Sequence, residues 1–550
     1  MNGRQIIILL TCLIIHFLVF SAILGFAAGG NSIYLPFVSG STGKKILAPE
    51  LKWQHGGCYP SWCETGWYSS PAVADLNNDG GMEIIASAYS VVVLDGKTGA
   101  LEWRVPSGHD RSQPEASNVG RTWPGIVVED LNADGQLEIV TAHGGGYLAV
   151  YNRNGYFEPG WPVQATGGLE LRGLAVSDLD KDGDLENIAT GAVYGKVNTW
   201  VYEHIGKLRS GWPQLSNDSG YAYGVFNDNA AVGDLDGDGY GELVIPSDVH
   251  YICAYERDGI QIPAADLYDG KGWGKIGVWE SPEIELRGWG TCEQNADRSE
   301  RFRANFAHGP AVIADVDRNG RREVIATGNV YDCAYGDYPS RYIGVYIFNT
   351  DRSRFAQSGF DWKMAPIDTG APLSEDYNQI ENAQANPAVA DLDGDGLLEI
   401  LFASYDGRMH AFWLDETEHG NWPYQVYDPG EGFLRFASEP AIVDLDQDGR
   451  AEVIFTSWVE KGTGETGRLY LLDYQGNPLY VVDLPPAFRG DWNGALAAPT
   501  LANIDTDPDL EVVLNTAHSG IIAYDLTGTS QGRILWGTGR GNFRRDGYLP

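Results

Sequence analysis

The sequence predicts an all-β fold: a β-propeller of four-stranded antiparallel blades, with eight blades favoured and seven as the alternative. One unit recurs along the chain, made of a short apolar strand, an Asp-rich loop and a β-branched strand. Its copies are spaced by roughly 50–60 residues, with two longer intervals. The 70 glycines, 29 tyrosines and 17 tryptophans favour short strands and tight turns over helices.

Further strand-like segments lie between the Asp-rich loops. Val91–Leu94 and Leu148–Tyr151 predict third strands, and the Trp-containing segments Leu101–Trp103 and Ile534–Trp536 predict fourth strands. One blade cannot bury both of its faces, whereas a closed ring of blades buries them all. The propeller is therefore expected to span residues 51–550.

The first 28 residues have the pattern of an export signal. Arg4 supplies a positive start, Ile6–Phe26 is an apolar run, and Gly25–Ala27 offers a small-x-small cleavage site. An uncleaved N-terminal anchor is the alternative, because the run approaches membrane-spanning length. Residues 29–50 are expected to be a linker, and the rest of the chain to be secreted or displayed at the cell surface.

The formal net charge of the chain is -37 at pH 7. An acidic surface repels nucleic acid phosphates and anionic lipids, so neither is an expected partner. A membrane contact is expected only through the N-terminal segment, if that segment is uncleaved. An extracellular glycan or protein is the expected partner.

The Asp-rich loops follow the nine-residue pattern D-x-[DN]-x-D-G-x-x-E, with small variations. Oxygen-bearing side chains at positions one, three, five and nine can converge on one ion. The candidate metal ligands in the eight loops are Asp75, Asn77, Asp79, Glu83; Asp130, Asn132, Asp134, Glu138; Asp178, Asp180, Asp182, Glu186; Asp234, Asp236, Asp238, Glu242; Asp315, Asp317, Asn319, Glu323; Asp391, Asp393, Asp395, Glu399; Asp444, Asp446, Asp448, Glu452; and Asn503, Asp505, Asp507, Glu511.

Calcium is the ion that this ligand set favours, because it takes six to eight hard oxygens in a flexible geometry. Glycine at position six allows a sharp turn with positive φ, and the terminal Glu is expected to bind through both oxygens. The predicted cofactor is therefore several Ca²⁺ ions with a structural role. In the eighth loop Pro508 replaces the glycine, which leaves calcium binding there open.

These repeats resemble the FG-GAP/VCBS repeats, the propeller units also found in integrin α-chains. The segment Ala307–Val312 before Asp315 is similar to the name-giving segment, and Gly160–Pro162 and Gly211–Pro213 fit bacterial versions. The resemblance covers roughly residues 51–550 and implies a calcium-binding propeller. It implies no single activity, since the family includes adhesins, lectin-like modules and some enzymes.

The two faces of a propeller receive different loops. Connections between first and second strands, which include the Asp-rich loops, emerge on one face, which we call the cation face. Connections between second and third strands, and between successive blades, emerge on the other, which we call the insertion face. The long insertions belong to the insertion face; they are residues 106–122, 281–306, 330–341 and 369–386.

The insertion face is expected to carry the function, because long loops in compact folds are usually functional or disordered. Two insertions carry Cys292 and Cys333, for which we predict a disulfide, while Cys253 lies in an apolar run and is expected to be a buried free thiol. Cys58 and Cys63 lie in another connection between blades. Side chains expected on this face are Tyr89, His143, Arg287, Trp289, Arg301, Tyr338, Tyr405, Asp406, Trp458 and His518.

The favoured function is a non-catalytic extracellular binding or adhesion module for a glycan or protein. The sequence has no G-x-S-x-G elbow, H-E-x-x-H helix or phosphate-binding glycine loop. A calcium-dependent polysaccharide lyase on an eight-bladed propeller is the alternative, with His143 or His518 as base. A purely structural matrix component is a third hypothesis.

Overall fold

The computed structural model describes residues 45–550, except 60–61, 65, 67, 192–196, 215–229, 248, 289, 308, 337–338, 367–371 and 382–385. The described residues form one compact unit. The predicted export signal and residues 29–44 of the predicted linker lie outside the described residues. Within the described part, no helix is long and apolar enough to cross a membrane.

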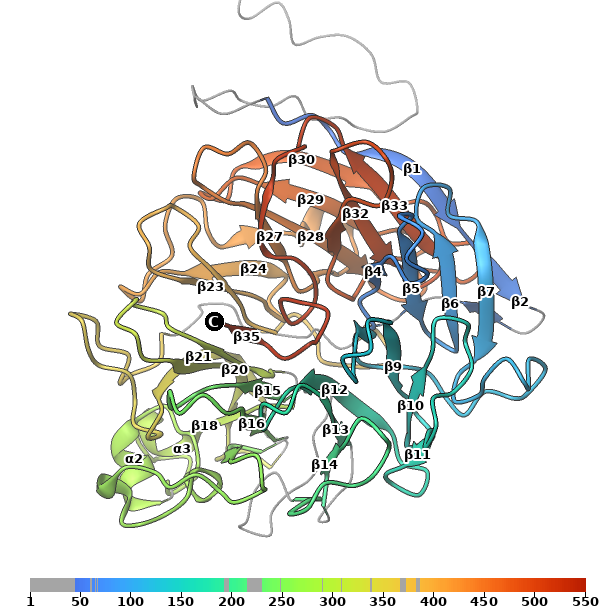
Figure 1. Ribbon diagram of the computed structural model, residues 1–550. Coiled ribbons are helices and arrows are strands. Elements are labelled where there is room, and N and C mark those ends of the chain that lie inside the picture. Colours follow the sequence, from blue (N-terminus) through green and yellow to red (C-terminus); the bar gives the residue numbers. More distant parts are fainter. Residues whose placement is uncertain are drawn as a thin grey trace, which may run out of the picture. The chain divides into compact units, whose positions relative to one another are not determined.

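Eight sheets form the blades of one ring, which confirms the predicted all-β propeller with eight blades (Figure 1). Four blades are four-stranded sheets, whose strands from the innermost outward are β4 (Ala72–Ala74), β5 (Glu83–Ser87), β6 (Ser90–Asp95), β7 (Leu101–Pro106); β8 (Val127–Glu129), β9 (Glu138–Ala142), β10 (Tyr147–Tyr151), β11 (Val163–Gln164); β22 (Ala388–Ala390), β23 (Glu399–Ala403), β24 (Arg408–Phe412), β25 (Tyr424–Gln425); and β31 (Thr500–Ala502), β32 (Leu510–Asn515), β33 (Ile521–Leu526), β1 (Glu50–His55).

The other four blades vary this plan. Their strands are β12 (Leu171–Ser177), β13 (Glu186–Gly191), β14 (Thr199–Tyr202); β15 (Ala231–Gly233), β16 (Glu242–Pro246), β17 (Ile252–Tyr255); β19 (Ala311–Ala314), β20 (Glu323–Asp332), β21 (Ser340–Asn349); and β27 (Ala441–Asp444), β28 (Glu452–Val459), β29 (Arg468–Leu472), β30 (Pro478–Asp483). Isolated antiparallel bridges, Thr199 to Gln214 and Tyr251 to Gly277, extend the first two of these blades outward.

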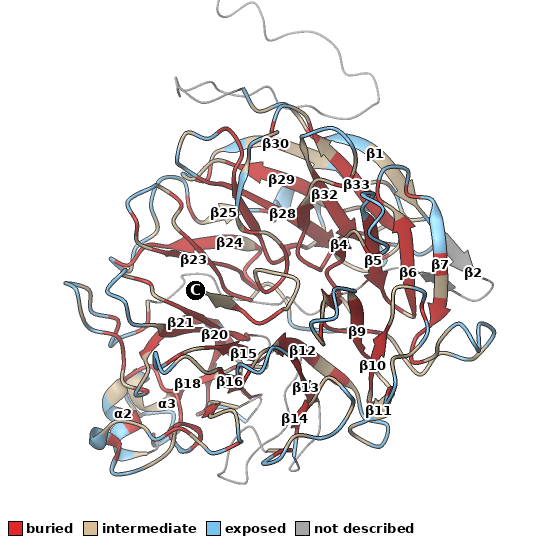
Figure 2. Ribbon diagram, in the orientation of Figure 1, coloured by how far each residue is buried: buried red, intermediate tan, exposed pale blue. Residues whose placement is uncertain are grey.

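The second strand of each blade is buried along nearly its whole length, as the red strands of Figure 2 show. Both faces of such a strand are covered because each blade packs against two neighbours. Val140 of β9, for example, belongs to the same apolar cluster as Leu174 of β12 and Trp200 of β14. Residues on both faces are therefore apolar, and these strands show no alternation of polar and apolar residues.

Tryptophans on the outer turns join neighbouring blades. The indole N–H of Trp161 donates to the carbonyl of His204 at 2.8 Å, and that of Trp212 donates to Arg257 at 3.1 Å. Trp422 makes the same contact with Tyr474 at 2.9 Å. Each of these rings is buried against the next blade, so the Trp-Pro motifs serve blade packing.

Both ends of the chain close the ring. Strand β1, near the N-terminus, pairs antiparallel with β33 and becomes the outer strand of the blade that carries the eighth loop. The prediction that Ile534–Trp536 forms that fourth strand was wrong. This segment is β34 (Arg533–Trp536), and it pairs with β27, the first strand of the neighbouring blade, because β1 already occupies the outer edge.

The C-terminal segment, residues 537–550, crosses the first strands of successive blades near the centre of the ring, where Figure 1 marks the C-terminus. Backbone N–H groups of Val176, Val232 and Ile313 donate to carbonyls of residues 544, 546 and 547 at 2.8–2.9 Å. Strand β35 (Tyr548–Leu549) then pairs in parallel with β19. The segment therefore links at least three blades at the hub.

Insertions add structure on one face of the ring. The 281–306 segment contains α2 (Pro282–Arg287), α3 (Arg298–Arg301) and β18 (Phe302–Asn305), which pairs with β20. In the same way β26 (Arg435–Ala437) pairs with β28. The insertion predicted over residues 330–341 is shorter than expected, because β20 continues to Asp332 and β21 starts at Ser340. Short elements complete the fold: β2 (Gly57–Tyr59), β3 (Trp62–Glu64), η1 (Asp266–Tyr268), η2 (Trp273–Lys275) and η3 (Pro429–Glu431).

Candidate metal centres and the opposite face

All eight Asp-rich loops connect the first strand of a blade to its second strand. The terminal Glu begins or lies in the second strand, and its Oε2 accepts a hydrogen bond of 2.6–3.1 Å from the backbone N–H of the second loop residue. Oε1 is therefore the oxygen left to face the loop. This contact favours one Glu oxygen per ion and argues against the expected binding through both.

Seven of the loops share one backbone conformation. Their fourth and sixth residues have φ between 55° and 95°, in the left-handed region. Glycine occupies every sixth position, as predicted. The fourth position was not predicted, because it holds residues as different as Asn78, Ala133 and Gln447. These two turns wrap the loop so that its alternate side chains face one point.

Carboxylate oxygens converge in these loops. In at least five of them, one ligand atom from each of three acidic residues lies within 4.8 Å of the others; the groups are Asp178, Asp180, Glu186; Asp234, Asp236, Asp238; Asp315, Asp317, Glu323; Asp391, Asp393, Glu399; and Asp444, Asp446, Asp448. The other predicted ligands occupy the same positions of their own loops.

Several of these oxygens are buried and accept no hydrogen bond from any described residue. They include Oε1 of Glu242 and Glu399, Oδ2 of Asp317 and Oδ1 of Asp444. A buried carboxylate oxygen without a partner is costly unless a cation compensates it. The donor set, composed of carboxylate and amide oxygens, fits calcium.

Burial raises the pKa of the terminal glutamates, and the neighbouring loop aspartates raise it further. The pKa of Glu83 and Glu138 rises to about 7, that of Glu242 and Glu323 to about 8, and that of Glu399 to about 9. A divalent cation at this point would favour the ionised form.

Basic side chains pair with carboxylates of at least four loops. Two of them belong to the fifth loop. Arg322 lies 3.8 Å from Asp234 of the fourth loop. Arg318 lies 3.2 Å from Asp391 of the sixth loop.

Two more basic side chains come from outside the loops. Arg209 lies 2.7 Å from Asp180 Oδ2 and 3.4 Å from Glu186 Oε1 in the third loop. In the eighth loop, Lys52 Nζ lies 2.6 Å from Asp505 Oδ2 and 2.7 Å from Glu511 Oε1. Sequence reasoning missed both residues, because each lies outside the nine-residue pattern.

The opposite ends of the first strands surround a pocket at the hub, which we call the hub pocket. Its walls come from the chain just before or at the start of the first strands of six blades, and from the C-terminal segment. The lining residues are Tyr68, Ser70, Trp123, Pro124, Gly125, Arg172, Pro310, Asn386, Glu439, Gly539, Arg540 and Arg545. Because the Asp-rich loops follow the same strands, the pocket lies on the insertion face.

Trp123 is the central ring of the hub pocket. Tyr68 stacks on it, with ring centroids 5.0 Å apart and an angle of 11° between the planes. The guanidinium carbons of Arg121 and Arg172 lie 3.9 Å and 4.1 Å from its centroid. The indole N–H of Trp123 and Oδ1 of Asn386 are buried, and neither bonds to a described residue. Sequence reasoning did not find this cluster, whose members come from different blades.

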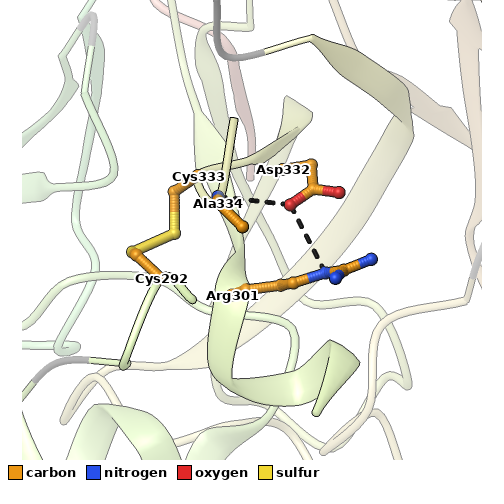
Figure 3. The surroundings of a disulfide bond; sticks show 5 residues. All are labelled: Cys292, Arg301, Asp332, Cys333 and Ala334. Carbon is orange, nitrogen blue, oxygen red and sulfur yellow. Dashed lines mark hydrogen bonds and ion pairs between the residues drawn. A yellow bond between two sulfur atoms is a disulfide. The ribbon is translucent and has the colours of Figure 1, made fainter. Parts of the chain in front are cut away.

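The predicted Cys292–Cys333 disulfide is present and ties the 281–306 insertion to the end of β20 (Figure 3). Beside it, the buried Asp332 accepts a hydrogen bond from the backbone N–H of Ala334 and pairs with Arg301, both at 3.3 Å. Cys253 is buried and is not part of a disulfide, as predicted. Cys58 and Cys63 occupy paired positions in the backbone register of β2 and β3.

Several side chains predicted to be exposed on the insertion face are buried. The exposed fractions of His143, Trp458, Tyr405 and Asp406 are 0%, 1%, 3% and 6%, so they offer no open surface. Trp458, for example, stacks on Phe436 of β26, which covers the end of β28. Tyr89, Arg301 and His518 are half-buried and Arg287 is exposed. Trp289 and Tyr338 lie outside the described residues.

The two histidines proposed as bases differ in access. His143 is fully buried, hydrogen bonds to Thr141 and Thr122, and has its pKa lowered to about 3 by burial. A base in this position cannot reach a polymer in solvent. His518 is half-buried beside Trp492, and burial also lowers its pKa.

The model of the FG-GAP-like repeat matches residues 130–189 and 391–455. No curated protein matches the chain by sequence. Among solved structures, the V. cholerae biofilm matrix protein Bap1 is 14% identical over 92% of this chain and 96% of its own, with a TM-score of 0.39. The Bacillus licheniformis rhamnogalacturonan lyase PL11 is 16% identical over 88% and 76%, with a TM-score of 0.45. At these identities and TM-scores, neither protein indicates an activity for this chain.

Proposed function

Because the chain is a β-propeller of FG-GAP-like repeats, we propose that it acts outside the cell as a calcium-stabilised, non-catalytic binding module. Its ligand is a glycan or a protein, held on the insertion face. Calcium occupies the cation face and stabilises the blades. The export pattern of residues 1–28 and the Cys292–Cys333 disulfide support an oxidising, extracytoplasmic location.

The hub pocket is the observation that carries this proposal. It gathers aromatic and guanidinium groups from several blades at one point of the insertion face. Trp, Tyr and Arg are the residues that contribute most to binding interfaces, because they combine large contact area with directional polar groups. Buried polar atoms of Trp123 and Asn386 supply hydrogen-bonding capacity in the same pocket.

Calcium is assigned a structural role for two reasons. The ligands of each loop come from one short segment, and its oxygens would surround the ion without leaving room for a substrate. The loops also lie at the opposite ends of the first strands from the hub pocket. The ions would therefore act by holding the first and second strands of each blade together.

A panel of acidic and neutral polysaccharides, run with the protein and calcium by size-exclusion chromatography, tests the proposal. Co-migration with an intact polymer is the expected result for a glycan ligand. A polymer that becomes shorter would contradict the non-catalytic role and favour a lyase. If no polymer co-migrates, cell-envelope proteins are run in the same way. Self-association without any partner would contradict the proposal and favour a structural matrix role.

A matched pair of substitutions locates the binding face. Arg121→Ala removes a guanidinium beside Trp123 and is expected to weaken ligand binding about tenfold. Arg153→Ala removes an arginine whose Nη1 lies 3.5 Å from the carbonyl of Asn77 on the cation face, and it should leave binding unchanged. Equal losses in both variants would place the ligand elsewhere.

A further inference from the structure

The eighth Asp-rich loop differs from the other seven because a lysine from the far end of the chain enters it. Lys52 Nζ lies 2.6 Å from Asp505 Oδ2, 2.7 Å from Glu511 Oε1 and 3.8 Å from Asp507 Oδ2. These three residues stand at the third, fifth and ninth positions, from which an ion would be bound. The ammonium therefore lies among the carboxylates that would bind an ion. Arg209 pairs with the third and ninth positions of the third loop, but that loop keeps the left-handed residues at positions four and six.

Strand β1 is shaped to deliver this side chain. The register between β1 and β33 shifts between Leu51 and Trp53, so Lys52 is the extra residue of a β-bulge. A bulge redirects the side chain of its extra residue relative to the regular alternation of the strand. Only 15% of the Lys52 side chain is exposed, and the Glu511 side chain is fully buried.

The backbone of the eighth loop is also different. The seven other loops have left-handed residues at positions four and six. In the eighth loop these positions hold Thr506 and Pro508, both described and both outside the left-handed region. Proline fixes φ near −65°, and a β-branched residue strongly disfavours positive φ. The loop cannot adopt the wrapped conformation of its seven relatives.

The hydrogen bonds within the eighth loop also differ from those of the other loops, because its backbone and its residues differ. In the seventh loop, the N–H of Gly449 at position six donates to Asp444 Oδ2 at 3.2 Å. Pro508 has no N–H to make this contact. The first residue is Asn503 instead of aspartate, and its Nδ2 donates to the carbonyl of Asp507. The amide group is thus engaged within the loop.

We propose that the ammonium of Lys52 is the permanent cation of the eighth loop, so that this loop binds no calcium. The blade that joins the two ends of the chain is then closed by a side chain of the protein. Calcium can leave the other seven loops without releasing β1 from the ring. The first test of this inference rests on the proposed calcium binding. The second test does not depend on calcium binding.

The first test compares calcium content after equilibrium dialysis. Asp505→Asn removes a carboxylate from the eighth loop, and Asp446→Asn removes the equivalent carboxylate from the seventh. The wild type and Asp505→Asn should hold equal amounts of calcium per chain, while Asp446→Asn should hold one ion fewer. Loss of one ion from Asp505→Asn would overturn the proposal.

The second test is made in excess chelator and measures thermal unfolding of Lys52→Met, Asp505→Asn and the double variant. Each single substitution should lower the unfolding midpoint, and the double variant should fall by clearly less than the sum, because the two residues interact. Additive shifts would overturn the proposal. If the first test finds no calcium in any variant, the proposed calcium binding fails while this second test still decides the role of Lys52.

Discussion

The two faces of the ring are built in opposite ways. On the cation face, every blade carries a nine-residue Asp-rich loop, and the backbone contact to the terminal Glu recurs in all eight. On the insertion face, the connections differ from blade to blade and include α2, α3, β18, β26 and a disulfide. Under the proposed function, the repeated loops stabilise the blades and the varied connections bind the ligand.

Removing calcium should have the largest effect on the stability of the protein. This effect should arise from the loops of the cation face alone. If calcium stands at about ten times its dissociation constant, each occupied loop adds roughly 1.4 kcal/mol to the free energy of unfolding. Chelation should therefore lower the unfolding midpoint strongly, and the midpoint should rise again with the logarithm of added calcium. A midpoint unchanged by chelator would show that these loops do not stabilise the ring.

The second-largest effect should be a dependence of the free energy of unfolding on pH, which we expect only when calcium is absent. The terminal glutamates have pKa values raised to about 7–9, so the folded chain binds more protons than the unfolded chain, whose glutamates titrate near 4.3. Stability is then lost as the pH rises through the folded values. The chelated protein should lose stability from pH 7 to 9.

Buried histidines change stability with pH in the opposite direction to the glutamates, and they do so at lower pH. Burial lowers the pKa of His143 and His250 to about 3, so their contribution to stability is gained as the pH rises toward 6.5 and is complete above it. Thermal midpoints at pH 7, 8 and 9, with chelator and with calcium, therefore isolate the glutamates. A midpoint that rises across this window in chelator would contradict their assignment.

Substitution of Arg545 should destabilise both faces together, because this residue lies at the hub. Its fully buried guanidinium donates to the carbonyls of Ser70, Pro71 and Ile126 at 2.9–3.1 Å, and burial lowers its pKa to about 9. Arg545→Met removes these three hydrogen bonds to a charged donor, at about 1.5–3 kcal/mol for each.

The neighbouring Arg544 provides the control. Its side chain is 43% exposed and pairs with Glu129 at 3.1 Å, so Arg544→Met should cost less than about 1 kcal/mol. Denaturant unfolding of the two variants measures the difference. Similar losses in both would show that the hub contacts of Arg545 contribute little.

Loss of the Cys292–Cys333 disulfide should destabilise the protein less than Arg545→Met does, and its effect should stay on the insertion face. The bond closes a loop with a sequence separation of 41, for which a constraint of about 2–4 kcal/mol is typical. The double Cys→Ser variant should be cut faster by protease within residues 281–306, with its calcium content unchanged. A fall in calcium content would show that the two faces are coupled.

The contrast between the faces also determines what the sequence could predict. The nine residues Asp391–Glu399 contain the whole loop, so the position of the loop and the eightfold repetition could be predicted from local pattern. Its metal ligands stay a prediction. The Cys292–Cys333 disulfide could be predicted because the propeller topology places both insertions on the same face. In contrast, Lys52 meets Glu511 across 459 positions and Arg545 meets Ile126 across 419, and no local pattern marks such contacts. The predicted exposure of Trp458 failed because a strand from an insertion covers it.

A calcium count tests the central claim most directly. The chain is stripped with chelator, dialysed against labelled calcium over a range of free concentrations, and the bound ions per chain are determined at saturation. We expect seven, one for each loop with left-handed residues at positions four and six. Saturation at none, or at only one or two ions, would contradict the claim.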